Sequence, residues 1–185
     1  VENTKRITAN GEFHGRIGRF KAKANVELAS GGNVALKCAM KNPKSGQKSL
    51  RASLTASDAN IGAILSNSLL GATYFTAKVD TKFGGGAPTD LKGEGTISDL
   101  TVNGYNYNDI SVVADIDGER IGGSITANDK AFQMEAQAIL EMNKDSEPLY
   151  DAVVSIAHAD RHAMNINRRD SVAVLKCDIG LSARG

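Results

Sequence analysis

The chain has 185 residues and a formal net charge of +1, with 22 Lys and Arg against 21 Asp and Glu. Proteins that bind nucleic acid usually carry a basic excess that neutralises phosphate, so this balance argues against a nucleic-acid partner. A hydrophobic fraction of 41% with only 3 Pro excludes a disordered chain. The length suits one folded domain, and we expect residues 1–185 to form a single β-rich domain.

Apolar and polar residues alternate along most of the chain, which is typical of strands that bury one face. The first clear run covers residues 20–28, where every even position is apolar: Phe20, Ala22, Ala24, Val26 and Leu28. The pair Gly31-Gly32 follows this run and predicts a hairpin turn into a second strand at residues 34–40. Another strand is expected at residues 50–56.

The period changes between Asp58 and Gly71. Apolar residues there fall at three- and four-residue spacing, namely Ile61, Ile64, Leu65 and Leu69. This spacing predicts a short helix that is capped by Asp58 and ends at Gly71.

Strands resume after the helix, and tight-turn dipeptides separate several of them. Asn103-Gly104 and Asp117-Gly118 tolerate the positive φ angles of two-residue hairpins. The remaining strands are expected at residues 72–83, 92–102, 110–116, 119–127, 131–142, 150–156 and 171–181. Crossover helices are missing between them, which excludes a parallel α/β fold. The sequence therefore predicts a mainly all-β protein: an extended, curved antiparallel sheet, or a taco-like or loose sandwich, of about ten strands with one or two short helices.

No set of residues in the sequence points to catalysis or to a bound cofactor. The histidines His14, His158 and His162 lack the partners of a zinc site or a catalytic triad. We therefore expect no enzyme activity, no cofactor and no metal. Cys38 and Cys177 each alternate with apolar neighbours, which favours small core residues and leaves a disulfide between them as an open alternative.

The repeated apolar face of the strands is the remaining functional feature. It either forms an ordinary buried core or stays partly open as a groove for acyl chains, since long apolar ligands need continuous apolar area and few directional bonds. Composition is compatible with both. The candidates for a lipid-binding apolar groove are Val112, Ile116, Ile121, Ile125, Phe132, Met134 and Leu140.

Several short segments follow one another in an informative order. Residues 56–71 (ASDANIGAILSNSLLG) contain a short helix of the type N-x-G-x-L-L, and residues 91–100 (LKGEGTISDL) a glycine-rich strand. Residues 103–110 (NGYNYNDI) follow as a hairpin of the type YNGYxYxN. Residues 147–151 (EPLYD) and 158–167 (HADRHAMNIN) then end on a piece of the type HADLxxLNL.

In this order the segments resemble the repeat of the TamB and AsmA-like proteins of the bacterial envelope. The resemblance covers residues 56–181 best. Arg161 and His162 depart from it, because the family is usually more apolar at these positions.

The resemblance implies a piece of a longer, non-enzymatic protein that is anchored in the inner membrane of a diderm bacterium and extends into the periplasm. Any membrane anchor would then lie in parts outside this chain. Such proteins are built from long β-sheets curled into an apolar trough, and the partners implied are phospholipid acyl chains and outer-membrane assembly proteins. The implied function is phospholipid transport between membranes, outer-membrane protein assembly, or both. The rival expectation is a closed structural or adhesive β-sandwich that acts through protein contacts.

Overall fold

A computed structural model of the chain describes residues 7–29, 31–42, 47–84, 87–142, 147–166 and 174–184. It contains one sheet of 12 strands and one short helix in this described part. The elements are β1 (Thr8–Arg16), β2 (Arg19–Glu27), β3 (Asn33–Lys41), β4 (Lys48–Asn60), α1 (Ile61–Leu65), β5 (Leu70–Gly84), β6 (Ala87–Val102), β7 (Tyr105–Tyr107), β8 (Ile110–Asp117), β9 (Arg120–Asn128), β10 (Phe132–Glu141), β11 (Leu149–Asp160) and β12 (Val174–Arg184).

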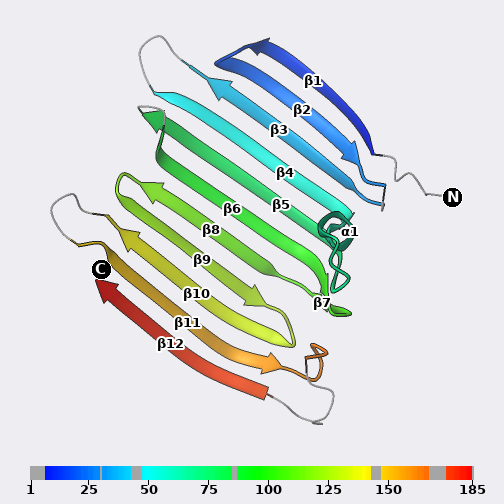
Figure 1. Cartoon of the computed structure of the whole chain (residues 1–185), viewed down its shortest axis with the longest axis vertical. Helices are drawn as coiled ribbons and strands as arrows, with labels where there is room; N and C mark the ends of the chain where they lie inside the picture. Colours follow the sequence, from blue (N-terminus) through cyan, green and yellow to red (C-terminus); the bar gives the residue numbers. More distant parts are fainter. Residues whose placement is uncertain are drawn as a thin grey trace.

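The sheet is an antiparallel meander. Its strand order is β1-β2-β3-β4-β5-β6-β8-β9-β10-β11-β12, and the short β7 pairs with β6. Figure 1 shows an open, curved sheet with β1 and β12 at opposite edges. The predicted all-β fold is confirmed, and its architecture is the extended sheet, because all described strands belong to one layer that does not close.

The register of the ladders sorts the side chains into two faces. Directly paired residues of antiparallel neighbours lie on the same side of a sheet, whereas successive residues of one strand alternate between sides. From β2 to β12 the pairing connects Ala22, Cys38, Ala52, Val79, Gly93, Ala114, Gly123, Ala138, Ala152 and Leu181. We call the side with this row the apolar face. The charged face is the other side, which carries Lys21, Lys37 and Arg51.

Two strands raise the number above the predicted ten. β1 escaped the prediction because its apolar-face positions are Ala9, Gly11, Phe13 and Gly15, and two glycines weaken the alternation. β7 is only 3 residues long and lies within the predicted hairpin.

The sheet buries few side chains completely. Ala131, Ala159 and Met164 form a small buried cluster, and each is 3% exposed. Partly buried residues pack against this cluster, namely Tyr105, Tyr107, Phe132 and Ile156. The chain exposes 12631 Å², whereas a compact monomer of its mass exposes roughly 8,500 Å². The uncovered sheet accounts for this excess.

The helix is shorter than predicted and begins later. Asp58, the predicted cap, lies at an irregularity of the β4–β5 ladder with a φ of 52°. Asn60 caps the helix instead, because its side chain accepts a hydrogen bond from a backbone N–H of the first turn at 2.9 Å. The helix ends at Ser66 in the left-handed conformation, and Gly71 already lies on β5. The ladder pairs Asn60 with Ala72, so strand hydrogen bonds take up the residues on both sides of the helix.

The last two strands differ from their predicted bounds. β11 is longer than the predicted strand at residues 150–156, and it includes His158. A turn after Asp160 then brings Met164 into the buried cluster. β12 is described from Val174 onwards, so the predicted start at residues 171–173 lies outside the described residues.

Candidate functional site

The seven residues predicted for the apolar groove all lie on the apolar face. β8 supplies Val112 and Ile116, β9 supplies Ile121 and Ile125, and β10 supplies Phe132, Met134 and Leu140. The ladders pair Val112 with Ile125 and Ile116 with Ile121. Ile121 in turn pairs with Leu140 on the next strand. The structure therefore brings these residues together in one patch over three neighbouring strands.

This patch is partly open to solvent. Ile121 and Ile125 are 37% and 41% exposed, and the other five residues are half-buried. Exposure rises towards the β12 edge, where Ile179 reaches 57% and Leu181 reaches 62%. The face is therefore neither a sealed core nor fully solvated.

The sequence prediction covered only the middle of this face. The pairing extends it over β3 to β6 and over β11 and β12, where it includes Leu36, Leu54, Val79, Leu91, Val154, Ile179 and Leu181. The same period-two alternation would have identified these residues, because each lies in register with the predicted seven.

A row of small residues runs across the middle of the apolar face. It consists of Ala22, Cys38, Ala52, Val79, Gly93, Ala114, Gly123, Ala138 and Ala152. The next row, two residues away along each strand and about 6.6 Å distant, is bulkier and includes Met40, Leu50, Leu91, Ile116, Ile121 and Leu140. The small residues therefore form a low strip across the strands beside a bulkier row, and we call this strip the furrow.

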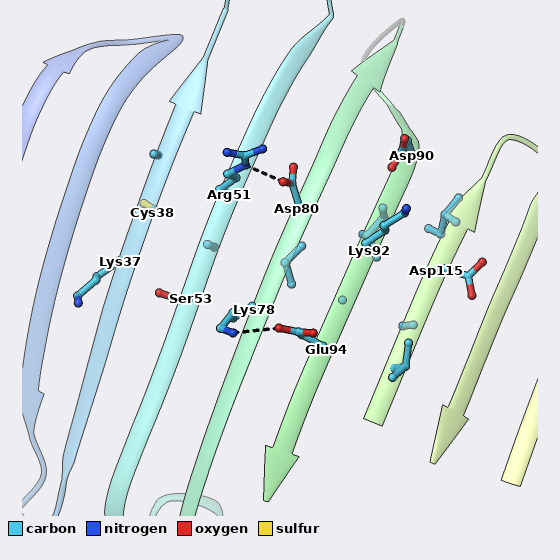
Figure 2. A pocket seen from close by; sticks show the side chains of 18 of the residues that line it. Lys37, Cys38, Arg51, Ser53, Lys78, Asp80, Asp90, Lys92, Glu94 and Asp115 are labelled. Atoms are coloured by element: carbon cyan, nitrogen blue, oxygen red, sulfur yellow. Dashed lines mark hydrogen bonds and ion pairs between the residues drawn. The ribbon is translucent and has the colours of Figure 1, made fainter. Parts of the chain in front are cut away.

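The charged face carries ion pairs between neighbouring strands. A hollow of about 1010 Å³ lies on this face. Figure 2 shows side chains from β3 to β8 around it. Arg51 Nε lies 2.6 Å from Asp80 Oδ2, and Lys78 Nζ lies 3.0 Å from Glu94 Oε1. All four side chains are well exposed, so each pair contributes at most about 1 kcal/mol to stability.

Two further pairs continue this pattern. Lys82 Nζ lies 2.8 Å from Asp90 Oδ2, and Arg120 Nη1 lies 2.7 Å from Asp115 Oδ2. The hydrogen bond between Lys82 and Asp90 raises the pKa of the lysine and lowers the pKa of the aspartate. Both shifts favour the charged forms, so this pair has no proton to exchange near neutral pH.

A second hollow of about 990 Å³ lies at the β1–β4 end of the charged face. Its charged lining residues are all basic, namely Arg16, Arg19, Lys21 and Lys41, together with His14. Asn42, Gln47 and Ser49 add polar side chains to the lining. We call this site the basic hollow. The near-neutral net charge of the chain concealed it at the level of composition.

Asp129 is a buried carboxylate, 3% exposed, at the turn between β9 and β10. It accepts hydrogen bonds from the Tyr105 hydroxyl at 2.5 Å, from the Ala131 N–H at 2.8 Å and from the Asn108 N–H at 3.2 Å. Burial raises the pKa of Asp129, but the hydrogen bonds outweigh burial and hold the pKa below its ordinary value. Burial, followed by the hydrogen bond to Asp129, raises the pKa of Tyr105 to about 12. The pair is thus a structural clamp for the turn.

Other candidate chemistry is dispersed in the described residues. No group of three or more His, Cys, Asp or Glu side chains among them is arranged to hold a metal ion. None of the helices in the described part is both long enough and apolar enough to cross a membrane. Cys38 and Cys177 are free and half-exposed on β3 and β12, so the alternative of a disulfide between them is not realised.

Comparisons with known proteins give no relative for this chain. No protein-family model matches it, and neither curated proteins nor solved structures show significant similarity. The functional argument therefore depends on the two faces of the sheet.

Proposed function

We propose that this chain is a non-enzymatic sheet segment of a TamB/AsmA-like envelope protein, and that its apolar face holds the acyl chains of phospholipids. The observation that carries the proposal is the apolar face itself, which continues from β1 to β12 and is partly open to solvent. Exposed apolar patches of such extent are typical of surfaces that bind lipid or protein.

The furrow favours an acyl chain as the occupant. It spans β2 to β11, which corresponds to roughly 38 Å across the strands. This exceeds the roughly 15 Å of hydrocarbon in one bilayer leaflet, so a whole acyl chain has room along the furrow. It is made of alanine, glycine, cysteine and valine side chains, which make no directional bonds.

The cellular setting of the proposal comes from the sequence resemblance. The full-length protein would be anchored in the inner membrane by parts outside this chain and would act in the periplasm. There the apolar face would serve phospholipid transport between membranes, assembly of outer-membrane proteins, or both.

Variants that introduce carboxylates on one face of the sheet test the proposal by their effect on lipid capture. Ile125→Asp with Met134→Asp places two carboxylates on the apolar face, and Ser124→Asp with Gln133→Asp places two on the charged face of the same strands. Mass spectrometry of lipids extracted from the natively purified long protein should find phospholipid with the wild type and with the Ser124 and Gln133 variant. It should find none with the Ile125 and Met134 variant, and unchanged capture would overturn the proposal.

The rival function is contact with another protein. The described residues form one layer, so a closed sandwich would need its second sheet from outside these residues. Two results together would favour the rival: the purified protein contains no lipid, and a second chain protects the apolar face from hydrogen exchange.

A further inference from the structure

Four cationic side chains of the basic hollow have no acidic partner among the described residues, whereas His14 Nε2 lies 3.8 Å from Glu12 Oε2. Within the described part of the chain, no carboxylate lies within 4.0 Å of Arg16, Arg19, Lys21 or Lys41. Elsewhere on the charged face, four cations have an acidic partner, namely Arg51, Lys78, Lys82 and Arg120. The basic hollow therefore gathers four unpaired cations in one place, whereas the larger hollow on this face is lined by side chains of both charges.

The ladder between β1 and β2 forces like charges together. Arg16 lies directly opposite Arg19. Directly opposed residues have Cβ atoms about 5 Å apart, and like charges in this arrangement destabilise a sheet. Lys41 joins them from β3, at the far side of the same hollow. A bound anion would relieve this repulsion.

From these observations, we propose that the basic hollow binds phosphate groups. Two arginines suit a phosphate because the planar guanidinium donates two parallel hydrogen bonds to its oxygens, and lysines add point charge. Asn42, Gln47 and Ser49 supply further side-chain hydrogen-bond donors in the lining. Among the described residues, the lining contains no Asp or Glu that would repel the anion. The ligand is thus a phosphate carried either by an anionic phospholipid headgroup or by a soluble phosphorylated compound.

The turn between β1 and β2 bears on the source of the phosphate. Ile17 is fully exposed between Arg16 and Arg19. An apolar side chain flanked by cations is typical of a tip that enters the interface of an anionic membrane. The hollow is on the face opposite the furrow, so this inference is independent of the function proposed above.

Charge-matched variants test the proposal. Arg16→Gln, Arg19→Gln and Lys41→Gln together remove three cations of the hollow. Lys78→Gln, Lys82→Gln and Arg120→Gln remove three paired cations of the same face and serve as the control. Pyrophosphate binding is followed by amide NMR shifts, and lipid binding by co-sedimentation with vesicles of 70% phosphatidylcholine and 30% phosphatidylglycerol, about the anionic content needed for a negative surface.

The hollow variant should bind its anion about 100-fold more weakly than the wild type, whereas the control should retain binding. Thermal unfolding checks that the variant folds, and its midpoint should equal or exceed that of the wild type because a repulsion is removed. The proposal would be overturned if the hollow variant bound both pyrophosphate and vesicles as tightly as the wild type. It would also be overturned if the control variant lost as much binding as the hollow variant.

Ile17→Ser distinguishes the two sources of phosphate. With a lipid headgroup as the ligand, this variant should bind vesicles more weakly and should leave the pyrophosphate shifts unchanged. With a soluble ligand, the wild type should bind pyrophosphate but not sediment with vesicles. Each result supports a phosphate site and identifies its natural class of ligand.

Discussion

Asn103 and Asn165 exchange hydrogen bonds across 62 residues of chain. The Asn103 side-chain amide donates to the Asn165 carbonyl oxygen at 2.9 Å, and the Asn165 amide donates to the Asn103 carbonyl oxygen at 3.1 Å. The pair joins the turn before β7 to the turn after β11. These two turns lie in the segments at residues 103–110 and 158–167 on which the sequence resemblance depends, so the fold brings those segments into contact.

Two replacements of Asn165 distinguish the contribution of its side-chain hydrogen bond to stability from the contribution of its backbone conformation. Its φ is 59°, a left-handed value that glycine adopts freely and alanine does not. Asn165→Gly should cost about 1 kcal/mol through the loss of the hydrogen bond that the Asn165 side chain donates, and Asn165→Ala should cost about 1–2 kcal/mol more. Urea unfolding measures both values. Equal stability of the two variants would show that the left-handed conformation carries no cost.

Asp129→Asn should destabilise the fold by about 1–3 kcal/mol at pH 7, because the amide cannot accept all the hydrogen bonds that the carboxylate accepts. The folded-state pKa of Asp129 lies below its ordinary value, so the carboxylate stabilises the fold above that value. This contribution is lost as the pH falls through the folded-state pKa. The difference between the variant and the wild type should therefore shrink in acid. Asp109→Asn, in an exposed neighbouring loop, is the matched control and should change stability little.

The raised pKa of Tyr105 predicts that the fold loses stability at alkaline pH. Its pKa is about 12 in the folded state, against about 10 for an ordinary tyrosine. Below pH 10 both states hold the proton and the contribution is complete, whereas between pH 10 and 12 the unfolded state releases the proton first and the folded state is disfavoured. Tyr105→Phe should flatten this decline in a series of unfolding curves from pH 8 to 11. An unchanged slope would contradict the clamp with Asp129.

Two glycines differ in the space available for a side chain, so their replacement by alanine should have different effects on stability. A Cβ at Gly62 in α1 would lie 1.8 Å from the Leu70 carbonyl oxygen, which is backbone and cannot move aside. A Cβ at Gly180 on β12 would meet no atom within 4 Å. Gly62→Ala should cost about 2–4 kcal/mol, and Gly180→Ala should be neutral or stabilise by about 0.5 kcal/mol. Thermal unfolding of both variants provides the comparison.

The two cysteines should react as separate thiols. Cys38 on β3 and Cys177 on β12 are eight strand spacings apart, roughly 38 Å along the sheet, and a disulfide requires Cα atoms within about 7 Å. A thiol-specific reagent should therefore modify both residues in the native protein. An intramolecular crosslink under oxidising conditions would show that the sheet folds over on itself.

Much of the sheet could be predicted from local patterns. β2 follows the alternation at residues 20–28. The Asn103-Gly104 turn connects β6 to β7, and the Asp117-Gly118 turn connects β8 to β9. The helix was misplaced because its cap depends on where the β4–β5 ladder stops, which is a contact between distant residues. Asp129 was not recognised because its donors come from β7 and the loop after it, about 20 residues away.

The basic hollow shows the same limit. Arg16, Arg19 and Lys21 are close in sequence, but Lys41 joins them only through the pairing of β2 with β3. Their isolation from carboxylates depends on which strands are neighbours, and a list of charges does not contain this information.

The sequence by itself determined that each strand has one apolar and one polar side, because successive side chains of an extended backbone point in opposite directions whatever the fold. Only the tertiary structure decided that all the apolar sides align in a single open layer. That outcome depends on the register of ten successive ladders and on the absence of a covering layer from the described residues, and both arise from contacts between strands rather than from the conformation of any one strand.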